Sequence, residues 1–244
     1  MEDLSIYLII IFISIVQSIF GVGILLFGTP TFIYLNYDFF ETLNILLPCS
    51  LIVSLIQIFN TKKNVKKNKK IFKKNFFIYC LSVIFISLIL LSKYADKIDF
   101  GQIVGITLII ILLTKLFSKL RKNFNFFINK NQKIINLLIG FIHGTTNMGG
   151  SFLSIYVNEI TKDDIKLKTY LIGYAYFFMA STQLLSLILT GNLYLTKVNI
   201  VCIILTIFSV IFTSRVIKNI RPYEYNLIFN SILLVYAFLL LVFK

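Results

Sequence analysis

The chain has 244 residues, of which 58% are hydrophobic, and its mean hydropathy is +0.88. Soluble domains are usually about 45–50% apolar, so this composition and the repeated apolar runs of about twenty residues predict an integral membrane protein. The net charge of +14 does not indicate nucleic-acid binding, because most lysines lie in short loops between the apolar runs, where membrane proteins carry them on the cytoplasmic side.

The first half of the chain opens with a broken apolar segment. Residues 4–20 and 24–35 are apolar, and Gly21-Val22-Gly23 interrupts them. Three longer apolar runs follow and predict transmembrane helices at about 42–60, 75–92 and 100–117. Eight lysines lie between the first two of these spans, at 62–74. Such a run beside the membrane is typical of a topology signal and of contact with anionic lipid headgroups.

The second half repeats this order. Residues 134–157 are apolar with a break at Gly144–Ser151, and further spans are expected at about 169–190, 198–214 and 224–243. A shift of 126 residues aligns the halves without a gap and places Gly23 on Gly149, Asp38 on Asp164 and Gln57 on Gln183. We therefore predict an all-α membrane protein with two homologous repeats, at 1–118 and 134–244, joined by a basic cytoplasmic linker at 119–133.

Two topologies fit this pattern. If each broken segment crosses the membrane once, the chain has eight crossings, and 16 of its 24 Lys and Arg residues are cytoplasmic. If each is a re-entrant hairpin, six crossings remain, the halves are inverted, both termini are outside, and 20 of the 24 are cytoplasmic. The positive-inside rule favours the inverted repeat. Residues 4–20 are nearly long enough to span alone, so whether 4–35 and 134–157 span or re-enter stays open.

The breaks carry the first candidate binding residues. An unpaired backbone amide costs several kcal/mol in lipid, so broken backbone is expected only where it is buried in protein or lines a cavity. The free N–H groups of a helix start also attract anions. In the first break the candidates are Gln17, Ser18, Gly21, Gly23 and Thr29. The glycines fit close helix packing as well, and Pro30 is expected to start or kink a half-helix.

The second break is richer in polar side chains. Its candidate substrate-binding residues are His143, Thr145, Thr146, Asn147, Gly149, Gly150 and Ser151. His143 is the only histidine and the only side chain at membrane depth that could titrate near neutrality, so substrate binding, proton coupling and a structural role all stay open. No other His, acid or Cys is spaced to form a metal site with it, and we expect neither a metal nor a cofactor.

A third set of candidates lies in the spans that follow the breaks. Ser50, Ser54 and Gln57 share one helix face, and their counterparts in the second half are Tyr176, Ala180 and Gln183. The two glutamines fit oxyanion binding and interhelical hydrogen bonding equally well. No Asp, Glu, Lys or Arg lies deep in a predicted span, so an anion would be bound by backbone amides and neutral side chains. Asp38 and Asp164 are expected to be loop or helix-cap residues.

A family resemblance accompanies these observations. Phe20-Gly21-Val22-Gly23 with Pro30, and Gly140 and Gly144 with Gly149-Gly150, stand at the start of two four-segment halves. This layout covers essentially the whole chain and resembles the TauE/SafE family of sulfite and organosulfonate exporters. The resemblance implies export of a small sulfur-containing or related organic anion, coupled to an ion gradient.

The sequence thus predicts a secondary transporter and not an enzyme. It would move a small anion, a sulfur oxyanion or organosulfonate, out of the cell by alternating access across the bacterial cytoplasmic membrane. We expect contacts with anionic lipid headgroups and no nucleic-acid partner. A coupling ion, H⁺ or Na⁺, and a homodimer are compatible with the pattern. The alternatives are an importer, a carrier of another small solute, and a non-transporting membrane scaffold or assembly protein.

Overall fold

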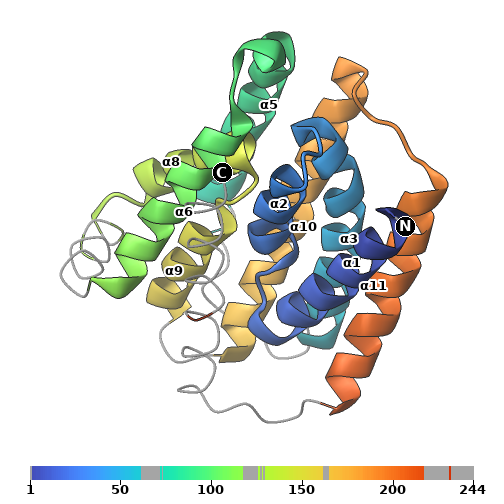
Figure 1. The fold of residues 1–244 in the computed structure, drawn as a ribbon. Helices are drawn as coiled ribbons and strands as arrows, with labels where there is room; N and C mark the ends of the chain where they lie inside the picture. The colour runs from blue at the N-terminus through green and yellow to red at the C-terminus, as the bar shows by residue number, and fades with distance from the viewer. Residues whose placement is uncertain are drawn as a thin grey trace.

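The computed structural model describes residues 2–61, 74–117, 130–161 and 165–216, with residues 72, 126, 128 and 231 singly. Helices make up the regular structure of this part of the chain (Figure 1), which confirms the predicted all-α class. The elements are α1 (Glu2–Phe20), α2 (Ile24–Tyr34), α3 (Phe39–Thr61), η2 (Phe76–Leu81), α5 (Ser82–Tyr94), η3 (Ala95–Lys97), α6 (Phe100–Leu116), α8 (Gln132–Thr146), α9 (Gly150–Thr161), α10 (Ile165–Thr190) and α11 (Lys197–Val216).

Three helical stretches in these ranges are long and apolar enough to cross a membrane, namely Phe39–Thr61, Phe76–Tyr94 and Leu167–Thr190. They correspond to the spans expected at 42–60, 75–92 and 169–190. The second combines η2 and α5, so a π-helical stretch opens that span. Shorter apolar helices include Phe100–Thr114 and Lys197–Thr213, at the places of the spans expected at 100–117 and 198–214. The span expected at 224–243 and most of the basic runs lie outside the described residues.

α3 and α10 form the central pair and share the most extensive helix contact in the described chain. They run in opposite directions (Figure 1). Near the start of α3, the side-chain nitrogen of Asn44 donates to the carbonyl of Asn192, just after α10 ends. Near the end of α3, Gln57 packs against Gly173 in the first third of α10. α1 packs mainly on α11, and α8 packs mainly on α5 and η2.

The packing of α8 on the continuous helix formed by η2 and α5 depends on two glycines. A Cβ at Gly140 would lie 2.5 Å from the carbonyl oxygen of Cys80, and one at Gly144 would lie 2.8 Å from the Cβ of Ser87. The two helices therefore touch backbone to backbone, in the small-xxx-small manner of membrane helices. Gly140 and Gly144, which belong to the glycine pattern of the second half, are therefore packing residues.

The connection from α2 to α3 ends in a capping box. The Phe40 amide donates to the Asp38 carboxylate at 2.8 Å, and the Asp38 amide donates to the Glu41 carboxylate at 3.1 Å. This reciprocal pair satisfies two of the free amides at the start of α3. The expected cap role of Asp38 is thereby confirmed, whereas Asp164 lies outside the described residues.

Two local details differ from the expectation. Of the two roles expected for Pro30, starting a half-helix is excluded, because α2 begins six residues earlier at Ile24 and Pro30 lies inside it. The helices also extend beyond the apolar segments expected at 134–157 and 169–190, because α9 continues to Thr161 and α10 begins at Ile165. The apolar pattern marks only the part of a helix that needs an apolar environment, and polar turns can extend the helix beyond it.

Candidate functional site

The first break turns the chain between α1 and α2. The Gly21 amide donates to the Gln17 carbonyl at 2.8 Å, and Gly21 has a left-handed φ of 77°, which ends α1 at low cost in strain. A Cβ at Gly23 would lie 2.7 Å from the Gln17 amide nitrogen, so the start of α2 lies directly against α1. The Phe27 amide then donates to the Gly23 carbonyl at 2.8 Å, which begins the hydrogen bonding of α2.

The second break has the same backbone construction at positions 126 residues later. The Asn147 amide donates to the His143 carbonyl at 2.8 Å, and Asn147 has a φ of 61°. Asparagine is one of the few residues that adopt this left-handed conformation readily. A Cβ at Gly149 would lie 2.6 Å from the Ile139 carbonyl oxygen, so the chain folds back on α8, and the Leu153 amide donates to the Gly149 carbonyl at 3.0 Å.

The two candidate glutamines bind the ends of the two broken helices. Gln57 donates from Nε2 to the Gln17 carbonyl at 3.2 Å, and Gln183 donates from Nε2 to the His143 carbonyl at 3.4 Å. Both donors and both acceptors are separated by 126 residues in the sequence. Each of these carbonyls already accepts the backbone amide four residues later, and its second lone pair accepts the glutamine. In this conformation the glutamines therefore act as interhelical hydrogen-bond donors.

A hydrogen bond also joins the two breaks to each other. Asn147 donates from Nδ2 to the hydroxyl of Thr29 at 3.0 Å, and both residues are fully buried. Ser50 and Tyr176 are fully buried as well, on α3 and α10. The Tyr176 hydroxyl packs so closely on Gly150 that no side chain would fit at that position. The structure thus brings residues from both halves of the chain into one buried region.

The remaining candidate hydroxyls are less well placed to bind a ligand. Thr145 and Thr146 donate to carbonyls one turn earlier in α8, at 2.8 and 2.7 Å, and Ser151 donates to the Met148 carbonyl at 3.2 Å. Ser18 and Thr145 are only half-buried. These side chains complete the helix ends in the present conformation.

Several buried polar atoms around the breaks have no hydrogen-bond partner. Most buried polar groups in proteins are paired, so such atoms mark places where a ligand could bind. They are Nε2 of Gln17, Oε1 of Gln57, Nδ1 and Nε2 of His143, Oδ1 of Asn147 and Oε1 of Gln183. Within the described ranges no Asp, Glu, Lys or Arg side chain is buried, and no group of three His, Cys, Asp or Glu residues could hold a metal ion. The region can offer neutral donors and acceptors.

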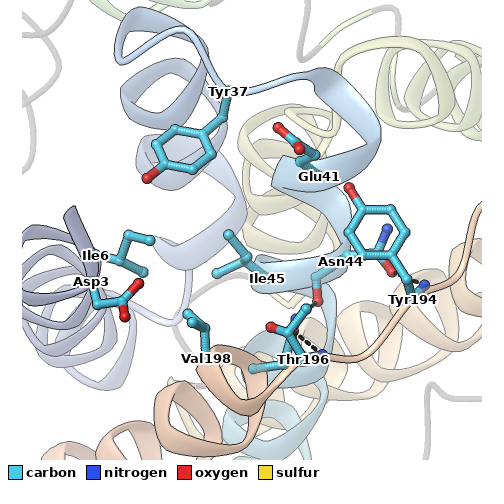
Figure 2. A pocket seen from close by; sticks show the side chains of 10 residues that line it. Asp3, Ile6, Tyr37, Glu41, Asn44, Ile45, Tyr194, Thr196 and Val198 are labelled. Atoms are coloured by element: carbon cyan, nitrogen blue, oxygen red, sulfur yellow. Dashed lines mark hydrogen bonds between the residues drawn. The ribbon is translucent and has the colours of Figure 1, made fainter.

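A second polar region lies at the start of α3, and the sequence had not indicated it. A pocket of about 230 Å³ is lined mainly by polar side chains (Figure 2), among them Asp3, Tyr37, Glu41, Asn44, Tyr194 and Asn199. Asn44 accepts from the Tyr194 amide at 3.0 Å, and Asn199 donates to the Asn44 carbonyl at 2.7 Å. Partial burial, and then the charges of Glu41 and Asp38, raise the pKa of Tyr194 to about 12.

The comparisons with known proteins agree with the fold class. Residues 6–240, nearly the whole chain, match the sequence model of the family described as sulfite exporter TauE/SafE. No curated protein and no solved structure matches the chain.

Proposed function

Because the chain belongs to the sulfite exporter TauE/SafE family, which comprises multi-pass membrane transporters and not enzymes, we propose that it is a secondary transporter of a small anion. The proposed substrate is a sulfur oxyanion or an organosulfonate, and the proposed direction is export from the cytoplasm of a bacterium. An ion gradient, of H⁺ or Na⁺, would drive the transport.

The observation that supports this proposal is the pair of equivalent breaks, each with unpartnered buried polar atoms beside it. A helix starts after each break, and helix starts favour anions through the helix dipole. The substrate would bind between the breaks and the α3–α10 pair, near Gln57, His143 and Gln183. A scaffold protein would have no need for two such breaks.

We further propose that the two halves are inverted repeats that rock about the anion in alternating access. Equivalent helices in inverted repeats run in opposite directions, and α3 and α10, which carry the equivalent Gln57 and Gln183, do so. In this arrangement both broken segments re-enter on their own side of the membrane.

Labelling of introduced cysteines tests this topology. The proposal expects cysteines at positions 164 and 218 to react with a membrane-impermeant maleimide only after the cytoplasmic side is exposed. The three native cysteines are buried and provide the unlabelled background. Reaction of either introduced cysteine from the outside of intact cells would contradict the inverted repeat.

Ligand binding and flux test the function itself. Purified protein should be stabilised against thermal unfolding by at least one of sulfite, thiosulfate, sulfoacetate, taurine or sulfate, and not by acetate. Proteoliposomes loaded with the stabilising anion should then lose it faster than protein-free liposomes. No stabilisation and no flux in either direction would contradict the anion-transporter proposal and favour another solute or a scaffold.

A further inference from the structure

The two breaks share their backbone geometry but differ in how the start of the second helix is occupied. In the first break Gln17 is fully buried, and its Oε1 accepts a hydrogen bond from the Ile24 amide at 2.8 Å. Ile24 is the first residue of α2. A side-chain oxygen of the protein itself therefore binds the N-terminus of α2, where an oxygen of an anion would otherwise bind.

His143 holds the equivalent position in the second break. Its carbonyl receives the same two hydrogen bonds as the carbonyl of Gln17, one from the residue that ends the helix and one from a glutamine. Its side chain does not cap the next helix, because neither ring nitrogen has a hydrogen-bond partner although the residue is fully buried. Among the described residues, no side chain therefore caps Gly150 in the way that Gln17 caps Ile24.

The imidazole of His143 is nevertheless held beside the start of α9. A Cβ at Gly149, the residue before α9, would lie 2.6 Å from the Cβ of His143. The imidazole meets the ring of Tyr176 edge to face, with 6.2 Å between centroids. The hydroxyl of that same tyrosine packs on Gly150, the first residue of α9. The unpartnered nitrogens and the helix start therefore belong to one small region.

We infer that the transporter binds one anion per chain, at the N-terminus of α9 beside His143, and that Gln17 closes the equivalent place at α2. This inference rests on the proposed function. The imidazole can donate one hydrogen bond to an oxyanion, the Gly150 amide at the start of α9 can donate another, and the helix dipole favours the negative charge. At α2 the neutral Oε1 of Gln17 takes the place that an oxygen of the anion would take at α9. The first break therefore needs no ligand to satisfy its helix start.

Exchanging the two residues tests this inference. Calorimetry on the full-length purified protein, with sulfite and thiosulfate as probes, should give about one site per chain. His143→Gln should weaken binding at least tenfold, because the glutamine side chain would cap α9 as Gln17 caps α2. Its melting temperature without ligand should stay within a few degrees of the wild type, since glutamine already occupies the equivalent position. Gln17→His should raise the stoichiometry toward two.

His143→Asn is the second variant. The shorter amide removes the imidazole and lacks the extra methylene with which Gln17 reaches the helix start, so binding should fall less than in His143→Gln. Ser92→Ala is the control, because its half-buried hydroxyl donates only to a carbonyl of its own helix, and its affinity should match the wild type. Two sites in the wild type, or unchanged binding in His143→Gln, would overturn the inference alone. No binding of any probe to the wild type would overturn the proposed function and the inference together.

Discussion

The buried amides at the start of α3 and those at the breaks differ in how completely they are hydrogen-bonded. Asn44 uses Nδ2 toward the carbonyls of Phe40 and Asn192 and Oδ1 toward the Tyr194 amide, so no polar atom of its side chain is left over. Gln57 and Gln183, equally far into the fold, each bind one carbonyl and leave Oε1 without a partner. All three residues are buried, so burial does not distinguish them. Their hydrogen bonding does, because Asn44 is fully paired and holds helices together, whereas Gln57 and Gln183 keep unpaired atoms near which a ligand could bind.

Removing Asn44 should give the largest effect on stability. Asn44→Ala would leave the Tyr194 amide and two carbonyls without their partner, and should lower the free energy of unfolding by roughly 2–4 kcal/mol. Anion affinity of the remaining folded protein should not change. Thermal unfolding and calorimetry of the purified variant measure the two quantities.

Thr42→Val on the same helix is the matched control. The Thr42 hydroxyl is buried without a hydrogen-bond partner, and valine has nearly the same shape, so stability should change little. Equal loss of stability in the two variants would contradict the distinction between satisfied and unsatisfied side chains.

Substitution of the two glutamines should affect transport more than stability, in contrast to substitution of Asn44. Gln57→Ala and Gln183→Ala each remove one long interhelical hydrogen bond, which in membrane proteins contributes about 1 kcal/mol or less. Transport should nevertheless fall about tenfold or more in each variant if the side-chain amides donate from Nε2 to the substrate anion. Flux from proteoliposomes with matched protein content checks this. Unchanged flux in both would remove the glutamines from the binding site and leave them as interhelical donors.

The smallest effect is expected at Tyr194. Its folded pKa of about 12 exceeds the usual value of 10, so folding favours the protonated hydroxyl. The associated stability is fully present below pH 10 and is lost as pH rises from 10 through 12. Tyr194→Phe should therefore lose less melting temperature than the wild type between pH 9 and pH 11, with no change in flux at pH 7. An equally steep fall in both proteins would show that this hydroxyl has no unusual titration.

The sequence predicted the features that depend on residues close together in the chain. The two breaks, the shared face of Gln57 with Ser50 and Ser54, and the Asp38 cap all follow from short-range patterns of glycine, amide and carboxylate residues. The breaks and the cap lie where these patterns indicated, and Ser50, Ser54 and Gln57 are all buried on α3. Local chemistry decides such features, so they can be inferred from neighbours in the chain.

Other features depended on contacts that no local pattern reveals. Three partners of Asn44 lie 148 to 155 residues away, and a single amide in an apolar run gives no sign of such distant partners. Gln17 was recognised as polar, but its bond to Ile24 forms only after the chain has turned at Gly21. The alignment of the two breaks therefore could not show that a side chain caps the second helix only in the first break.

The contact of α8 with α5 affects how mutations in this protein should be interpreted. Neither Gly140 nor Gly144 has room for even a methyl group, because the neighbouring atoms belong to the backbone or to the Cβ of another helix. A genetic screen for lost transport would therefore recover substitutions at both positions, next to His143 in sequence and space. Those substitutions would abolish transport by preventing the helices from packing. Only variants whose folded protein is recovered in normal amounts can therefore identify residues that contact the anion.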